Sequence, residues 1–297
     1  MGRSPVEGGR DWDGGEAAME EQEPKNAPRR RFSRFQLVVR PDEESERIAE
    51  RIREALLRSG FELAEAPELV IAVGGDGTML EAFHRYYPKV PEAAFVGLHT
   101  GTLGFYADWK RYEADWMIET ILKTEAPRIV EYPLVAAIFE YKDGRRHRHL
   151  ALNETIVRSK TLSTFVVDVW INGDRFETFR GDGLILSTPS GSTAYSHSVG
   201  GSILHPSIAA LQVSELAAIN NVEYRTLGRS FILPRHHVLD IYPMHPDGEM
   251  LVGVDGNVFY AQGVVRIQAH VAEEKVRFAR YRDFPFWQRV RMKFLGD

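Results

Sequence analysis

The sequence predicts two domains, an α/β domain built on a parallel sheet and a β-rich domain that follows it. The chain has 297 residues, about the length of two average domains. As far as residue 132, short apolar runs alternate with segments of helical period, which is typical of a parallel sheet with helices on its faces. Beyond Pro127 the apolar runs are separated by turn residues instead, which indicates antiparallel strands.

The first domain begins at Phe35, where an apolar run opens that Pro41 ends. In the next segment Ile48, Ile52 and Leu56 recur every four residues, which predicts a helix with one buried face. The elements that we expect here are a strand at 35–39, a helix at 42–59, a strand at 68–73, a helix at 78–87, a strand at 93–98 and a helix at 112–123.

Residues 1–34 lie before this pattern and are rich in Gly, Glu, Pro and Arg. A segment of this composition buries too little apolar surface to offset its ordering entropy, so we predict a disordered extension. We interpret its basic triplet, residues 29–31, as a solvated run rather than a docking patch.

The second domain is predicted over residues 133–268. Asn172-Gly173 between two apolar runs is a strong hairpin signal. The strands that we expect are 132–141, 146–159, 164–171 and the runs FILP, HVLDIYP and MLVGVDG. The last segment, 271–297, has a strand-like part and then a helical pattern. The predicted fold class is therefore α/β plus all-β, with an N-terminal Rossmann-like parallel-sheet domain and a C-terminal β-sandwich-like domain.

Composition and charge exclude several classes of protein. The formal net charge is −5, so no general basic field favours nucleic acid as a partner. No apolar run approaches the roughly 18 residues that cross a bilayer, and we expect no membrane partner. The absence of cysteine excludes disulfides and thiolate chemistry, and we expect a cytoplasmic protein. The ten histidines show no ligand spacing, so we predict no metal site built from side chains.

A glycine-rich loop, Gly74-Gly75-Asp76-Gly77-Thr78, joins an expected strand to an expected helix. Glycines let a phosphate approach the backbone amides, and the start of the helix favours negative charge. The carboxyl end of a parallel strand is also where open α/β sheets place their ligands. The sequence therefore predicts a phosphate site here, although the chain has neither a P-loop nor a dinucleotide-binding glycine fingerprint.

Two further patterns suit a nucleotide. Residues 180–201 combine glycines, hydroxyls and Tyr195, which suits an adenine ring that is stacked and hydrogen-bonded. Asn153-Glu154 lies within the expected strand 146–159, and an amide beside a carboxylate suits a vicinal diol. A polar pair on a strand is more often merely solvent-facing, so by itself this pattern leaves both readings open.

Taken together, these motifs resemble those of the NAD kinases. The family's order is kept by GGDGTML (74–80), GLHTGTLGFYAD (97–108), LNE (152–154), GDGLILSTPSGSTAYSHSVGG (181–201), NNVEYRTLGRS (220–230) and VDG (254–256). GGDGT alone is shared with phosphofructokinases and with diacylglycerol and sphingosine kinases, whereas the 181–201 motif together with Asn153-Glu154 is specific. The resemblance covers about residues 35–297 and is to the short bacterial members.

The resemblance implies that residues 269–297 return to the first domain, at 35–132, and that the site lies between the domains. It implies Asp76 as the catalytic residue. The implied NAD-binding residues are Asp76, Gly77, Phe105, Asn153, Glu154, Asp182, Thr193, Ala194, Tyr195, Ser198, Tyr224 and Asp255. The phosphate-binding residues are Gly74, Gly75, Gly77 and Thr78, with Arg180 as a further partner. Gly256 stands where some relatives carry histidine, which puts a side-chain contact there in doubt.

The implied reaction transfers the terminal phosphate of ATP to the 2′-hydroxyl of the adenosine ribose of NAD, giving NADP. Mg²⁺ or another divalent cation would bind through the phosphates, and polyphosphate stays open as a second donor. A homotetramer or homodimer is expected. Asp76 could accept the hydroxyl proton, orient the hydroxyl or position the metal. A lipid or sugar kinase and a non-catalytic NAD-binding sensor are the alternatives, and the presence of Asp76 disfavours the sensor.

Overall fold

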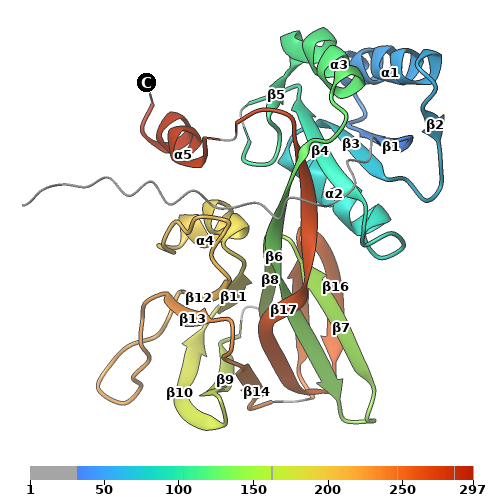
Figure 1. The fold of residues 1–297 in the computed structure, drawn as a ribbon. Coiled ribbons are helices and arrows are strands. Elements are labelled where there is room, and N and C mark those ends of the chain that lie inside the picture. The colour runs from blue at the N-terminus through green and yellow to red at the C-terminus, as the bar shows by residue number, and fades with distance from the viewer. Residues whose placement is uncertain (1–31, 103, 162, 246, 284, 297) are drawn as a thin grey trace, which may run out of the picture.

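The computed structural model describes residues 32–102, 104–161, 163–245, 247–283 and 285–296. It has an α/β lobe and a β lobe, joined by two long strands that run through both (Figure 1). Residues 1–31 of the predicted disordered extension lie outside the described residues. For residues 32–34 the prediction was wrong, because Ser33 donates its backbone N–H to Glu68 at 2.8 Å and β1 begins at Arg34. None of the described helices has the length and apolar character required to span a bilayer.

The α/β lobe follows the alternation that the sequence predicts. Its elements are β1 (Arg34–Val39), α1 (Glu43–Arg58), β2 (Glu62–Leu63), β3 (Leu69–Gly74), α2 (Asp76–Tyr86), β4 (Ala94–His99), β5 (Trp109–Lys110), η1 (Arg111–Glu113) and α3 (Ala114–Lys123). Helix α1 begins where the side chain of Asp42 accepts a hydrogen bond from the Ser45 backbone N–H at 3.0 Å. Strands β1, β3 and β4 pair in parallel, and every residue of β3 and β4 is buried, as in a sheet covered on both faces.

The β lobe contains most of the remaining strands. Its elements are β7 (Arg146–Ala151), β8 (Glu154–Ser159), β9 (Phe165–Ile171), β10 (Asp174–Gly181), β11 (Gly183–Ser187), η2 (Ser190–Thr193), α4 (Tyr195–Ser198), β12 (Ala210–Leu216), β13 (Phe231–Pro234), β14 (Leu239–Pro243), β15 (Glu249–Val254) and β16 (Asn257–Gln262). The hairpin predicted at Asn172-Gly173 joins β9 to β10, and both turn residues have positive φ.

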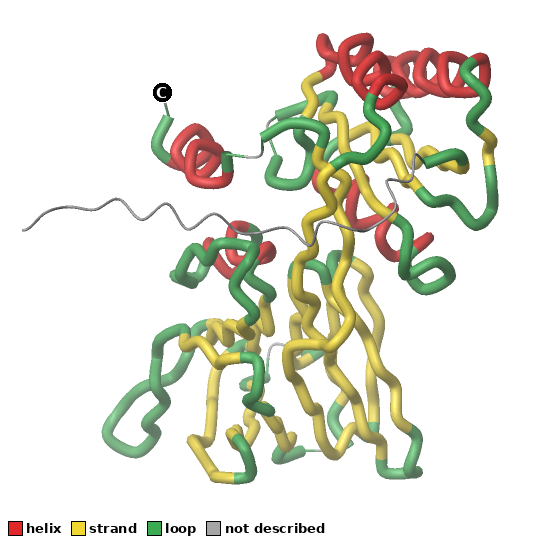
Figure 2. Tube along the Cα trace, viewed as in Figure 1, coloured by secondary structure: helices red, strands yellow, loops and turns green. Residues whose placement is uncertain are grey.

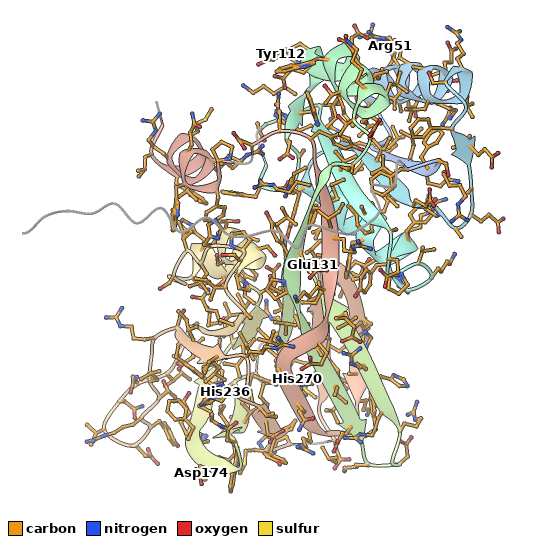
Figure 3. The ribbon with its side chains drawn as sticks, viewed as in Figure 1. Arg51, Tyr112, Glu131, Asp174, His236 and His270 are labelled. Atoms are coloured by element: carbon orange, nitrogen blue, oxygen red, sulfur yellow. The ribbon has the colours of Figure 1, made fainter. Side chains whose placement is uncertain are left out.

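Two strands, β6 (Arg128–Tyr141) and β17 (Val264–Arg280), connect the lobes. Within the described residues they belong to an eleven-stranded sheet with the main order β10-β9-β14-β17-β4-β3-β1-β2. A six-stranded antiparallel sheet, β13-β12-β11-β8-β15-β16, packs against it in the β lobe. Figure 3 labels Glu131 and His270 along this ribbon, with Tyr112 and Arg51 at the α/β end and Asp174 at the other end.

The cores follow from this arrangement. In the α/β lobe, α1 and α3 bury residues such as Ile52 and Met117 on one face of the sheet, and α2 buries Met79 and Phe83 on the other. In the β lobe, apolar side chains of the two sheets, such as Val167 and Leu186, form the core between them. Figure 2 shows the concentration of helix in the upper lobe and of strand in the lower one.

The chain end returns to the α/β lobe, as expected. The second half of β17 pairs in parallel with β4, and a helix, α5 (Phe286–Phe294), follows. The predicted domain limits of 35–132 plus 269–297 and 133–268 stay a prediction, because β6 and β17 cross from one lobe to the other.

One expected element was wrong. The segment 146–159 is two strands rather than one, with a break at Leu152 and Asn153. Strand β7 joins the eleven-stranded sheet and β8 joins the other. The apolar pattern of the segment continues into the break because residues 151 and 152 are both buried, so the pattern carries no sign of the break.

Candidate functional site

The glycine loop lies at the carboxyl end of β3, as predicted. Gly75 precedes α2, and Asp76 is its first residue. The Asp76 side chain is partly exposed, Gly77 is exposed, and Thr78 is buried in the first turn of the helix. The loop therefore leads directly into the N-terminus of a helix, which is a position that favours the binding of phosphate.

The carboxylate of Asp76 is held by the loop that follows β4. Oδ2 accepts the backbone N–H of Phe105 at 2.9 Å, and Oδ1 accepts that of Tyr106 at 3.2 Å. Gly104 makes this approach possible, because a Cβ atom there would lie 2.2 Å from Oδ1 of Asp76. The aspartate is thus oriented by backbone groups that cannot rotate away.

The same loop reaches the β lobe through Tyr106. Its hydroxyl donates a hydrogen bond to Oδ1 of Asn153, and the tyrosine ring is buried. Burial raises the pKa of Tyr106 well above its ordinary value, so the hydroxyl keeps its proton and acts as a donor. Asn153 and Glu154 lie at the break between β7 and β8, where both side chains are buried. The alternative that the pair faces solvent was wrong.

The carboxyl group of Glu154 is buried, and its pKa is raised. Burial, reinforced by the nearby carboxylate of Asp255, raises its pKa to about 8, against a smaller lowering effect of the Tyr195 backbone N–H. Its Oε2 atom is buried and has no hydrogen-bond partner among the described residues. A buried oxygen of this kind is suited to a ligand hydroxyl.

Asp255 lies beneath this pair at the β15–β16 turn, where its φ is 49°. Its side chain is fully buried and accepts hydrogen bonds from the backbone N–H groups of Leu152, Asn153 and Glu154 at 2.7–3.0 Å. The carboxylate therefore points at the backbone of the pair. Its predicted direct contact with NAD stays a prediction.

The predicted adenine segment adjoins Glu154. Tyr195 exposes 41% of its surface, and Ser198 is exposed beside it on α4. Gly191 packs so closely on Asn153 that a Cβ atom would lie 2.1 Å from the Asn153 carbonyl oxygen. Thr193 and Ala194 are partly exposed at the end of the short helix before Tyr195. These residues place an open aromatic ring next to the buried polar pair.

Three predicted residues form a separate group. The guanidinium of Arg180 lies 4.3 Å from the ring centre of Tyr224, and Asp182 is exposed nearby in the chain. Tyr224 belongs to the β12–β13 loop, which Figure 1 shows at the outer side of the β lobe. Among the described residues, no recorded contact joins this outer group to Asp76 or Glu154. Their roles toward NAD and phosphate stay predictions.

Several residues at the site were not predicted. Helix α5 packs Phe286 and Phe294 against Phe105, with ring centres 6.1 and 5.9 Å apart, and Arg289 donates to the Gly104 carbonyl at 3.2 Å. Arg40 follows β1 and lies against the loop at Gly101. Arg40 could have been predicted at the site, because it directly follows a parallel strand. Nothing in the sequence indicates the contacts of α5.

Metal-ligating side chains do not cluster here. Among the residues that the structure describes, no group of three or more His, Cys, Asp or Glu side chains is arranged to hold a metal ion. The glycine loop offers one partly exposed carboxylate, Asp76, which is the kind of single ligand that Mg²⁺ uses when phosphates supply the others.

A glycine loop at a helix N-terminus, with its aspartate linked through Tyr106 to the buried amide of Asn153, fits a class of protein, the enzymes that phosphorylate a nucleotide hydroxyl. The comparisons give the family. Residues 62–126 match the model of the ATP-NAD kinase N-terminal domain, and residues 152–281 match that of the C-terminal domain. This chain belongs to the NAD kinase family.

Similar proteins agree with this assignment. The chain is 48% identical to NAD kinase 1 of Bacillus anthracis over 266 residues, which is 89% of this chain and 99% of that protein. It is 49% identical to the NAD kinase of Shouchella clausii over 269 residues, covering 89% and 100%. Because the chain belongs to this family, the alternative of a lipid or sugar kinase is not favoured, and the protein is an enzyme.

Solved structures share the fold. The yeast NADH kinase complexed with NADH has a TM-score of 0.74 and 18% identity, with 91% of this chain and 92% of that one covered. An NAD kinase from Archaeoglobus fulgidus in complex with ATP has a TM-score of 0.69 and 22% identity, with 87% and 98% covered. The predicted fold class is confirmed.

Proposed function

We propose that this enzyme transfers the terminal phosphate of ATP to the 2′-hydroxyl of the adenosine ribose of NAD, giving NADP. One observation carries the proposal. The backbone N–H of Tyr106 donates to the Asp76 carboxylate and its hydroxyl donates to Asn153, so one residue links the glycine loop to the proposed diol-binding pair. A phosphate on the loop and a ribose on the pair would lie side by side.

In this mechanism the β lobe holds the acceptor. The ribose hydroxyls would bond to Asn153 and to the unpartnered Oε2 of Glu154, and the adenine ring would lie on Tyr195. These contacts turn the 2′-hydroxyl toward the glycine loop of the α/β lobe. The transfer is then largely a matter of positioning and charge stabilisation.

Asp76 would accept the proton of the 2′-hydroxyl as that oxygen attacks the terminal phosphorus of ATP. The P–O bond to the leaving ADP breaks as the new bond forms, and the backbone N–H groups at the start of α2 stabilise the negative charge. The donor phosphates would lie on Gly75, Gly77 and Thr78. The donor phosphates, together with the Asp76 carboxylate, would hold Mg²⁺, which would neutralise part of the phosphate charge.

The test is an end-point assay with purified enzyme, NAD, ATP and Mg²⁺, in which an NADP-specific dehydrogenase measures the product. NADP formed by the wild type and not by an Asp76→Asn variant is the expected result. If folded wild-type enzyme makes no NADP, with ATP or with polyphosphate, the proposal is wrong. Parallel reactions with NADH and with polyphosphate determine the range of acceptors and donors.

We also propose a homo-oligomer located in the cytoplasm. Both edge strands of the six-stranded sheet carry exposed apolar side chains, Ile232 on β13 and Val258 and Tyr260 on β16. Unpaired strands with apolar surfaces are common places of association. Light scattering after size exclusion should give a mass at least twice the 33.8 kDa of one chain. A mass of one chain would contradict the proposal.

A further inference from the structure

We propose that His84 and Asp255 act as a positioning pair that fixes the Asn153–Glu154 backbone relative to the glycine-loop helix. The inference rests on the proposed function for the role of Asn153 and Glu154. His84 and Asp255 are 171 residues apart in the chain, and they meet where α2 of one lobe touches the β15–β16 turn of the other.

The carboxylate of Asp255 has all the partners that it can use. Oδ1 accepts from the backbone N–H groups of Asn153 and Glu154 at 2.7 and 3.0 Å. Oδ2 accepts from the N–H of Leu152 at 2.8 Å and contacts Nε2 of His84 at 2.8 Å. Backbone N–H groups can only donate, so both carboxylate oxygens act as acceptors. We therefore assign the proton of the fourth bond to Nε2 of His84.

These bonds fix a segment that would otherwise be irregular. Residues 152 and 153 belong to neither β7 nor β8, so their backbone N–H groups have no ladder partners. The backbone of Asp255 adds a fifth bond by donating to the carbonyl of Glu154 at 3.1 Å. One buried carboxylate therefore replaces the sheet as the partner of the segment that presents the ribose-binding side chains.

His84 ties this arrangement to the catalytic end of the molecule. It lies eight residues after Asp76 on the same helix, about 12 Å along the axis. A helix transmits a displacement rigidly, so the contact with Asp255 sets where Asp76 stands relative to Asn153 and Glu154. The bond from Tyr106 to Asn153 is a second contact between the lobes at the site.

His84 is accessible to substitution without opening the core. Its side chain is 26% exposed on the wall of a cavity of about 630 Å³. His149, on β7, lines the same cavity and stacks on Phe259 with ring centres 4.8 Å apart. Among the described residues, His149 makes no recorded contact with Asp255. Substitution of His149 is therefore a matched control for substitution of His84, because both histidines line this cavity.

The experiment compares His84→Leu, His84→Gln and His149→Leu with the wild type. His84→Leu removes the donor to Asp255, and we expect kcat to fall and the Kd of NAD to rise, each about 10-fold, with the KM of ATP unchanged. His84→Gln keeps an N–H group near the position of Nε2 and should restore both values to within about threefold. His149→Leu should leave all three values unchanged.

Calorimetric titration with NAD and thermal melting accompany the kinetics. A lower Tm for His84→Leu with unchanged kcat and unchanged Kd of NAD would show a purely structural contact and overturn the inference. Equal effects of His84→Leu and His149→Leu on kcat and on the Kd of NAD would also overturn the inference. If the wild type binds NAD but forms no NADP, the proposed reaction is wrong, while the Kd values still test the pair.

Discussion

In the α/β lobe, Asp76 stands at the end of a parallel strand with its side chain partly open to solvent, whereas Glu154 and Asp255 in the β lobe are buried. Asp76 and Asp255 both accept backbone N–H groups of a neighbouring loop, so the two lobes orient their aspartates by the same means. In the proposed reaction, exposure suits Asp76, which would meet the reacting hydroxyl, and burial suits Glu154 and Asp255, which would hold the acceptor in position.

The largest loss of activity is expected from substitution of Asp76. Asp76→Asn keeps the shape and one acceptor oxygen but cannot take up a proton, so kcat should fall by about 10²–10⁴-fold. Steady-state kinetics with saturating NAD and ATP measure the change, and NAD titration confirms that binding is retained. Near-normal turnover in a variant that binds NAD would mean that Asp76 is not the base.

Gly104→Ala tests whether the orientation of Asp76 matters as much as its charge. The added Cβ would lie 2.2 Å from Oδ1, so the carboxylate must move, and kcat should fall by about 10²-fold. Gly253→Ala is a matched control, since a Cβ there would have its nearest neighbour at 3.8 Å. Equal kinetics for the two alanine variants would contradict the role given to the loop.

The raised pKa of Glu154 predicts that NAD binding depends on pH. Because its pKa is raised to about 8, Glu154 is protonated at neutral pH and ionises above it. An ionised carboxylate accepts stronger hydrogen bonds from ribose hydroxyls, so the KM of NAD should fall as the pH rises through 8. Glu154→Gln should remove this dependence and match the wild type within about threefold at pH 6.5. Parallel profiles for the two proteins would refute the assignment.

The raised pKa of Glu154 also makes the stability of the folded chain depend on pH. The folded chain keeps the Glu154 proton up to about pH 8, whereas the unfolded chain loses it near 4.5. Between these values the unfolded state binds fewer protons, so the contribution of Glu154 to stability decreases as the pH rises. The free energy of unfolding of Glu154→Gln should lack this component when urea midpoints are compared at pH 5 and pH 8.

A weaker effect is expected from the hydroxyl of Tyr106, which makes one of the contacts between the lobes. Tyr106→Phe removes the bond to Asn153 and leaves the buried ring, so kcat/KM for NAD should fall by about 3- to 10-fold. The KM of ATP should not change. A loss as large as that of Asp76→Asn would indicate that Tyr106 takes part in the chemistry.

Much of the α/β lobe could be predicted because its helices and buried strands have clear periods. The glycine loop was placed correctly at the end of β3, and α1 starts at Glu43 beside the expected residue 42. The fold class, too, followed from the alternation of elements. In the β lobe the hairpin at Asn172 was found because its turn chemistry is local.

The rest depends on contacts distant in the chain. The backbone N–H groups at the break, residues 152 and 153, are bonded by Asp255, about a hundred residues later, and no local pattern marks the break. Tyr106 was passed over because its apolar neighbours make it look like a core residue, and its hydroxyl finds Asn153 only after folding. The packing of Phe294 on Phe105 likewise joins segments that the sequence keeps far apart.

The shared ribbon of β6 and β17 has a mechanical consequence. Strand β17 pairs with β14 in its first half and with β4 in its second, and β6 accompanies it through both lobes. The pairing of β6 with β17 has a register shift near the middle of β17, between Val271 and Lys275, and continues on both sides of it. Outside this irregularity, a hinge between the lobes would have to break ladder hydrogen bonds, so we expect loops and α5 to admit substrate and release product.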